Sequence, residues 1–192
     1  MYVAAQYGHE DVLKLLIEKG PDPSAARTDG ETPVYVAAQY GHAGALALLI
    51  EANANPSAAK TTNGATPVFI AAHQGHMEVL PLLLAAGADP STARTDNGQT
   101  PVYIAAQKGH ADVVRLLLEA NADPSAAVYM AAQKGRADVL ALLLEAKADP
   151  SAATTDDGTT PLFIAAKNGH VEVVRLLLEA GADPSTAKTT DD

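Results

Sequence analysis

Apolar positions recur along the chain in long, similar blocks, and the block at residues 97–124 is the most complete. In this block residues 101–108 predict a short helix, because Thr100 can cap its start and a proline suits the first helical turn. Gly109 predicts the end of that helix, since glycine adopts the left-handed conformation common at helix C-termini. Residues 111–120 predict a second helix, so the block is a helix pair.

The second helix of this pair has too many apolar positions for a single buried face. They are Val113, Val114, Leu116, Leu117 and Leu118. One helix pair cannot cover both sides of such a helix. Copies of the pair must therefore stack on one another, which predicts a solenoid.

The glycines that end the first helices give the repeat length. They are Gly8, Gly41, Gly75, Gly109, Gly135 and Gly169. Their spacings are 33, 34, 34, 26 and 34 residues, so six helix pairs are predicted and one interval is eight residues short. We expect a single domain, residues 1–192, with repeats at approximately 1–28, 29–62, 63–96, 97–127, 128–156 and 157–192.

A family resemblance rests on the run Thr100-Pro101-Val102-Tyr103-Ile104-Ala105-Ala106, followed by Gly109-His110 and the segment LLLEANAD. This run resembles the ankyrin repeat, whose signature is Thr-Pro-Leu-His-x-Ala in a unit of about 33 residues. The resemblance implies an all-α solenoid of stacked helix-turn-helix pairs with short β-hairpin or turn fingers. It also implies a non-catalytic module for protein–protein interaction. The sequence departs from the family by placing aromatic residues at the histidine position of the signature, namely Tyr35, Phe69, Tyr103, Tyr129 and Phe163.

Two repeats carry residues that disfavour their second helix. Gly44 in the second repeat costs roughly 1 kcal/mol relative to alanine within a helix. Pro81 in the third repeat removes a backbone hydrogen bond, and we expect it to shift the start of the helix or to bend it.

The short interval before Val128 removes the segment that would form a finger. We predict that repeats four and five stay stacked, because a finger leaves and returns near the same point. Ser125 is then the nearest cap, so the next helix is predicted to begin near Ala126 and to be longer than its counterparts. The rival outcome is a break that separates residues 1–127 from residues 128–192.

Composition excludes several classes of protein. A net charge of −10 disfavours nucleic-acid binding, and the absence of cysteine excludes disulfides and Cys-based metal sites. The apolar runs are too short to insert into a membrane, and an intracellular protein, cytoplasmic or nuclear, is expected. We expect no cofactor, no metal and no enzyme activity. The recurring histidines are predicted to bond backbone at the junction between the two helices, and the metal interpretation of His73 and His76 is disfavoured because Gly75 separates them.

The candidate binding residues precede the helix-ending glycines, where the copies differ. They are Tyr7, Gln39, Tyr40, His73, Gln74, Gln107, Lys108, Gln133, Lys134, Lys167 and Asn168. In ankyrin-like proteins the matching positions face the concave groove together with the fingertips, here residues 29–31, 62–65, 96–99 and 156–159. The tyrosines fall in the N-terminal half and the lysines in the C-terminal half, which predicts a partner protein or peptide that is apolar or aromatic at one end and acidic at the other. Unselected drift on a solvated surface stays open as the alternative.

Other functions stay open at this point. The array could space or stiffen a larger polypeptide without a tight partner, and a hydrolase is a remote third hypothesis. A monomer is expected, and the last helix, residues 171–180, offers an uncovered face for weak self-association.

Overall fold

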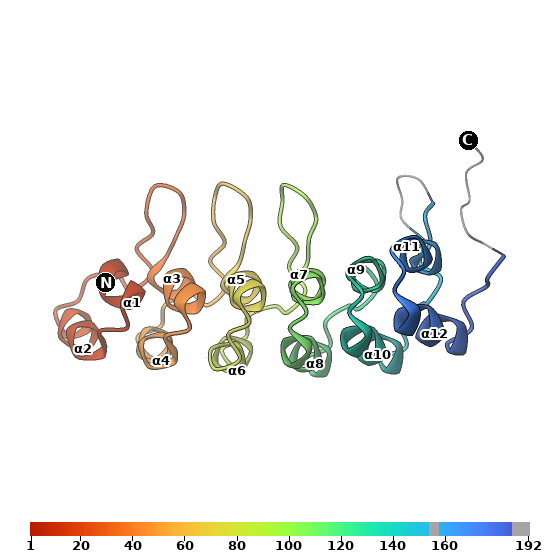
Figure 1. The fold of residues 1–192 in the computed structure, drawn as a ribbon. Helices are drawn as coiled ribbons and strands as arrows, with labels where there is room; N and C mark the ends of the chain where they lie inside the picture. Colours follow the sequence, from red (N-terminus) through yellow and green to blue (C-terminus); the bar gives the residue numbers. More distant parts are fainter. Residues whose placement is uncertain (154–157, 186–192) are drawn as a thin grey trace. The chain divides into compact units, whose positions relative to one another are not determined.

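The computed structural model describes residues 1–153 and 158–185, and these residues form twelve α-helices and no strand. Two compact units make up the chain, Met1–Pro101 and Val102–Asp192. Each unit consists of helix pairs in the order expected from the glycine spacing (Figure 1). The all-α architecture predicted from the sequence is confirmed.

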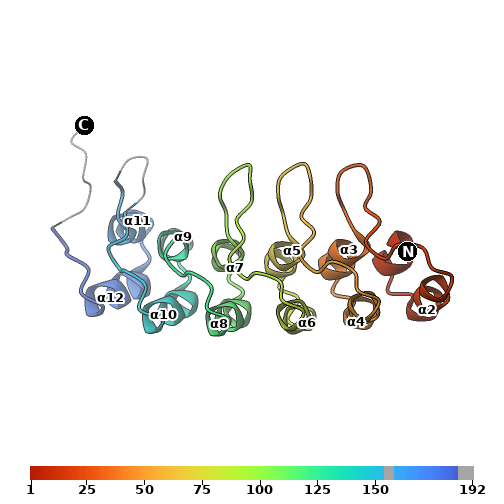
Figure 2. The same cartoon turned by 180° about the vertical axis from the view of Figure 1, so that it is seen from behind.

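In the first unit the first helices of the pairs pack side by side in one row and the second helices in another (Figures 1 and 2). We call these the first-helix row and the second-helix row. The helices are α1 (Tyr2–Gln6), α2 (Glu10–Glu18), α3 (Pro33–Tyr40), α4 (Ala43–Glu51), α5 (Pro67–Gln74) and α6 (Leu80–Ala85).

The second unit has the same arrangement and begins within α7 (Pro101–Lys108). Its other helices are α8 (Ala111–Glu119), α9 (Ala127–Lys134), α10 (Ala137–Glu145), α11 (Pro161–Lys167) and α12 (Val171–Glu179). Helix α9 packs against α11, and α10 packs against both α8 and α12. None of the described helices is long and apolar enough to cross a membrane.

The core of each unit is a ladder of leucines from the second helices. The residue eight positions after each helix-ending glycine is fully buried from the second repeat onward, at Leu49, Leu83, Leu117, Leu143 and Leu177. Burying one such side chain stabilises the fold by about 1.5–3 kcal/mol. The first helices contribute alanine pairs to the core, and their small side chains allow neighbouring helices to approach closely. Helices α4 and α10 pack against a second helix on both sides, as predicted, whereas Leu15 of α2 and Leu178 of α12 are exposed.

Local chemistry fixes the ends of the first helices. The hydroxyl oxygens of Thr32, Thr66 and Thr160 accept hydrogen bonds from the amide three residues later, at 3.1 to 3.2 Å. A proline follows each of these threonines at the first helical position. Gly41 then ends α3 in the left-handed conformation, at a φ of 74°. The predicted caps of these helices are therefore present.

Helix α6 is short, as Pro81 predicts. It begins at Leu80, whereas α8 begins two residues after its helix-ending glycine, at Ala111. Residues 77–79 form a turn instead of the first helical turn. By contrast, α4 has its full nine residues although it contains Gly44.

The missing finger before α9 does not separate repeats four and five. Helices α8 and α10 pack together, and Leu117 is fully buried, so the predicted stacking is confirmed. Figure 1 shows that the chain enters α9 without a finger.

Helix α9 begins at Ala127, next to the predicted start near Ala126, but its predicted length and cap are wrong. It has eight residues, the same as α3, α5 and α7. No side chain caps it, because the Ser125 hydroxyl donates to Asp123 at 2.7 Å instead. Ser125 is bonded within the Asp-Pro-Ser turn and does not cap the helix. The hydrogen bonds from the hydroxyl and the backbone amide of Ser125 lower the pKa of the Asp123 carboxyl.

Candidate partner-binding surface

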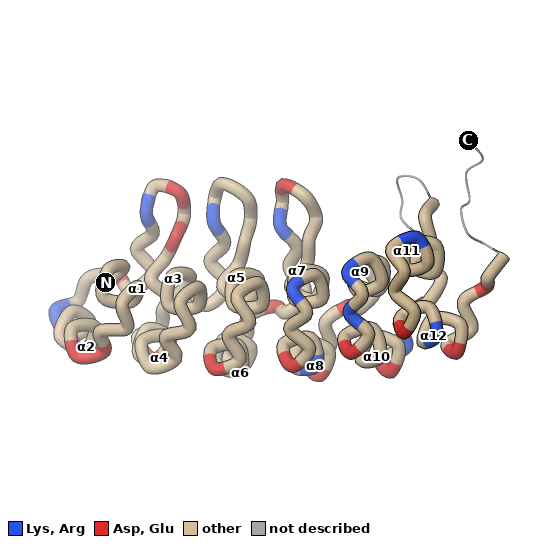
Figure 3. The backbone as a smooth tube through the Cα atoms, in the orientation of Figure 1, with Lys and Arg blue, Asp and Glu red and all other residues tan. Residues whose placement is uncertain are grey.

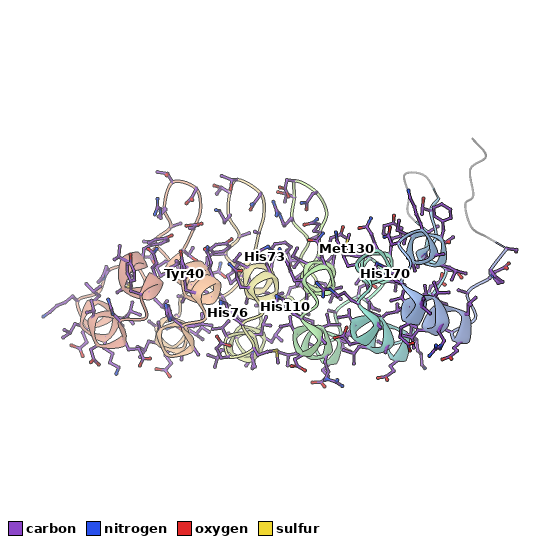
Figure 4. The ribbon with its side chains drawn as sticks, viewed as in Figure 1. Tyr40, His73, His76, His110, Met130 and His170 are labelled. Carbon is purple, nitrogen blue, oxygen red and sulfur yellow. The ribbon has the colours of Figure 1, made fainter. Side chains whose placement is uncertain are left out.

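A histidine–glycine joint links neighbouring repeats at three places within the two units. The Nε2 atom of His76 lies 3.1 Å from the backbone oxygen of Gln39, in the preceding repeat. His42 and His170 make the same contact with the oxygens of Gln6 and Gln133, at 3.0 and 3.2 Å. The prediction that these histidines bond backbone is confirmed, and the acceptor belongs to the preceding repeat. Figure 4 shows His76 and His170 between the first-helix row and the second-helix row of their units.

The helix-ending glycine leaves the space that the imidazole occupies. A Cβ built on Gly41 would lie 2.7 Å from Nδ1 of His76, and one built on Gly135 would lie 2.7 Å from Nδ1 of His170. In the fifth repeat Arg136 replaces the histidine, and its guanidinium carbon lies 2.8 Å from the equivalent point on Gly109. Glycine is therefore required here for its positive φ and also for the close approach of the next repeat.

The two residues before each glycine differ in exposure. The first of them, such as Gln39, His73, Gln107 or Gln133, is half-buried. The second is exposed at Tyr7, Tyr40, Gln74, Lys108, Lys134 and Asn168. The joints at Gln6, Gln39 and Gln133 use only the backbone oxygen of the first residue. The side-chain amide of Gln107 does reach the next repeat, where it donates to the sulfur of Met130 at 3.7 Å.

Asn168 is another predicted binding residue whose side chain contacts a neighbouring repeat. Its side-chain amide donates a hydrogen bond to the backbone oxygen of Gln133 at 3.0 Å, beside the contact of His170 with the same oxygen. Asn168 thus supports the joint between the fifth and sixth repeats. Lys167, next to it, is exposed and free to contact a partner.

The exposed tyrosines of the first unit are held in place by neighbouring histidines. The ring of Tyr7 stacks on His9, with centroids 5.9 Å apart, and the ring of Tyr40 stacks on His42 at 6.4 Å. Tyr7 is 62% exposed and Tyr40 is 47% exposed. Figure 4 shows Tyr40 on the first-helix row. These are large, partly ordered aromatic surfaces open to solvent.

The fingers contain a set of contacts that the sequence analysis missed. A cation at the base of a finger lies over an aromatic ring in the first helix of the same repeat, at 5.0 to 5.6 Å from the ring centroid. The pairs are Arg27 over Tyr2, Lys60 over Tyr35 and Arg94 over Phe69. In each pair the cation follows the aromatic residue by 25 positions, and this spacing is the signal that could have revealed the contact.

These contacts also engage the fingertip residues. Glu31 accepts hydrogen bonds from the Tyr2 hydroxyl at 2.5 Å and from Lys60 at 2.8 Å. Burial, and then the bond to Glu31, raises the pKa of Tyr2 to about 12. Burial followed by the negative charge of Glu31 raises the pKa of Tyr35 to about 12.

The predicted fingertips therefore differ from one another. The tip at 29–31 is half-buried or buried and holds the fold together, whereas Asp96, Asn97 and Gly98 of the third tip are exposed. In the second tip Gly64 and Ala65 are buried. In the fourth, residues 156 and 157 lie outside the described residues and Thr159 is buried.

Candidate metal chemistry finds no support among the described residues. No group of three or more His, Asp or Glu side chains there could hold a metal ion. His76 contacts Gln39 and, through Nδ1, the carboxylate of Glu78 at 3.2 Å. His76 is therefore occupied in the joint between repeats.

Stacked helix pairs with threonine-capped first helices, glycine ends and projecting fingers define a helical repeat protein. The chain matches the family model described as ankyrin repeats (3 copies) at residues 1–94, 52–127 and 123–188, and it belongs to this family. It is similar to the ankyrin repeat domain of human ASB11, with 27% identity and a TM-score of 0.86 over 98% of this chain and 86% of that chain.

An ankyrin repeat domain from Acinetobacter baumannii AYE is similar as well. It has 30% identity and a TM-score of 0.87, with 95% of this chain and 97% of that chain covered. No curated protein matches the chain. Ankyrin repeats generally serve protein–protein interaction, so this is the general class of function that the family supports.

Proposed function

We propose that the chain is a non-catalytic module that binds a protein or peptide through the exposed residues before its helix-ending glycines. The observation that carries this proposal is that the joint between repeats and the exposed surface use different groups of neighbouring residues. The histidine holds the backbone oxygen of one residue, while the neighbouring side chain is exposed and differs between repeats. Repeat proteins use such surfaces for binding because the frame tolerates changes in these side chains.

In the first unit the contacts are aromatic. Tyr7 and Tyr40 are already stacked on histidines, so little side-chain entropy is lost when a partner packs against them. Aromatic residues of this kind are frequent hot spots of interfaces. The surface suits apolar or aromatic groups of a partner.

In the second unit the contacts are basic. Lys108, Lys134 and Lys167 occupy the corresponding stretch of α7, α9 and α11, and Figure 3 shows these basic positions in blue. Exposed charges mainly increase the rate of association and contribute less to affinity. The surface suits an acidic segment.

Selection from a display library of random 12-residue peptides tests the proposal. Binding of the selected peptides is then compared between the wild type, Tyr40→Ala and Lys134→Ala at moderate salt. We expect Tyr40→Ala to weaken binding more, and Lys147→Ala, an exposed lysine at the end of α10, to have no effect. The opposite ranking contradicts the proposed roles, and a failure to select any peptide favours a spacer without a tight partner.

A further inference from the structure

The second helices carry a basic residue and a glutamate at two fixed repeat positions, but the second and fifth repeats lack the basic residue and the third repeat lacks both. Six positions after the helix-ending glycine the residues are Lys14, Ala47, Pro81, Arg115, Ala141 and Arg175. Ten positions after it they are Glu18, Glu51, Ala85, Glu119, Glu145 and Glu179. Ala85 is thus the one departure from glutamate in its series, and α6 is the one described second helix without any charged residue. In Figure 3 the visible part of α4 is also uncharged.

Two grooves on the second-helix row of the first unit allow a direct comparison. The groove between α2 and α4 has a volume of about 260 Å³ and is lined by Lys14, Ile17, Glu18, Leu48, Glu51 and Ala52. The groove between α4 and α6 has a volume of about 240 Å³ and is lined by Ala47, Ile50, Glu51, Leu82, Ala85 and Ala86. The two linings occupy the same six repeat positions. Three of the six residues are charged in the α2–α4 groove, and only Glu51 is charged in the α4–α6 groove.

The α4–α6 groove therefore combines an apolar lining with a single acidic group. Ile50, Leu82 and Ala85 belong to the apolar lining. Glu51 is exposed and forms no ion pair with any described residue. No basic residue lines this groove, because Ala47 stands at the repeat position of Lys14.

We propose that the α4–α6 groove binds an amphipathic helix of a partner protein, which inserts an aliphatic side chain and pairs a lysine or arginine with Glu51. A helix fits because it can lie in the groove between two packed helices, where ridges of side chains enter grooves. Residues four apart on that helix are 5–6 Å apart at Cβ, so a leucine in the groove places an arginine one turn away beside its rim. The site lies on the second-helix row and is separate from the tyrosine and lysine surface on the first-helix row.

The probe is a 16-residue helical peptide with leucine and arginine at i, i+4 spacing, titrated into methyl-labelled protein and followed by NMR. We expect saturable shifts of the Ile50 and Leu82 methyl signals. The methyls of Ile17 and Leu48, in the α2–α4 groove of similar size, serve as the internal control and should stay unchanged. Equal shifts in both grooves, or none in either, overturn the proposal.

A matched variant converts one groove into the other. The double variant Ala47→Lys/Ala85→Glu gives the α4–α6 groove the charges of the α2–α4 groove, with residues that the first repeat already carries at those positions. We expect it to keep the helical circular dichroism spectrum and to weaken peptide binding at least tenfold. Unchanged binding overturns the proposal.

Further variants test the proposed ion pair between Glu51 and the peptide arginine. Glu51→Gln should weaken binding several-fold and flatten its salt dependence, and replacing the peptide arginine by glutamate should abolish the shifts. Tyr40→Ala should leave this peptide's affinity unchanged, so the test is independent of the function proposed for the first-helix row. Shifts of Ile50 and Leu82 that depend on protein concentration without peptide would show a second copy as the occupant and overturn the proposed partner.

Discussion

Replacing Gly41 with alanine should destabilise the fold more than the same change at Gly169. Both glycines have a φ of 74°, so the backbone strain of the new side chain is the same at the two sites. They differ in what the new Cβ meets. At Gly41 it would meet the carboxylate of Glu78 and lie 2.7 Å from Nδ1 of His76, whereas at Gly169 nothing lies within 4 Å.

The magnitude follows from two contributions. An alanine in the left-handed region costs about 1–2 kcal/mol at either site. At Gly41 the imidazole of His76 must also move and lose its contact with the Gln39 oxygen, and a hydrogen bond contributes about 0.5–1.5 kcal/mol. The expected loss in free energy of unfolding is therefore about 1.5–3.5 kcal/mol for Gly41→Ala and about 1–2 kcal/mol for Gly169→Ala.

Urea unfolding followed by circular dichroism measures both losses, and a double-mutant cycle with His76→Ala isolates the joint. The half-exposed carboxylate of Glu78 can rotate away into solvent, so without the imidazole most of the excess cost of Gly41→Ala should disappear. If Gly41→Ala costs no more than Gly169→Ala and shows no coupling to His76, the joint does not stabilise the stack. Hydrogen exchange of the amides in α3 and α5 locates the effect along the chain.

Three further outcomes are expected. Lys147→Gly should raise the free energy of unfolding by about 1 kcal/mol, because Lys147 has a positive φ of 63° at the position where the third repeat has Gly87. Urea unfolding measures the change, and a loss of stability would contradict the prediction. Between pH 10 and 12 a tyrosine in the unfolded chain ionises while Tyr35 in the folded protein keeps its proton, so the free energy of unfolding should fall as the pH rises through this range. Tyr35→Phe should reduce that fall. Equal pH profiles for the wild type and this variant would contradict the raised pKa of Tyr35. Leu178 is 43% exposed on α12, so any self-association detected by sedimentation velocity should weaken in Leu178→Glu; unchanged association would exclude this face.

Features set by local chemistry could be predicted from the sequence. Threonine followed by proline marks a helix start and glycine marks its end, and each rule depends on residues only a few positions apart. The shortened α6 followed from Pro81 for the same reason. Stacking followed from the excess of apolar positions in the second helices.

The missed features depend on competition or on contacts between residues far apart in the sequence. The Ser125 hydroxyl had two possible hydrogen-bond partners nearby, a backbone amide at the start of α9 and the Asp123 carboxylate. Its position in the sequence does not show which of the two bonds forms. Lys60 lies 25 positions after Tyr35, so their contact depends on how the chain folds back over the ring, and only the recurrence of this spacing in three repeats could have indicated it. The candidate binding residues lie at or just after the ends of the first helices, and the support that Asn168 gives to a neighbouring repeat was not foreseen.

The joint between repeats has a direction. At each joint described above, one repeat contributes a glycine and the repeat that follows it contributes a histidine, or Arg136. A gene segment that encodes one whole repeat can therefore be copied in tandem, and the copy recreates a complete joint at both of its borders without any further substitution. Unequal recombination between such similar segments can lengthen or shorten the array in steps of one repeat. A crossover that shifts the boundary within a finger would instead lose a finger while keeping the joint, which is the arrangement found before Val128.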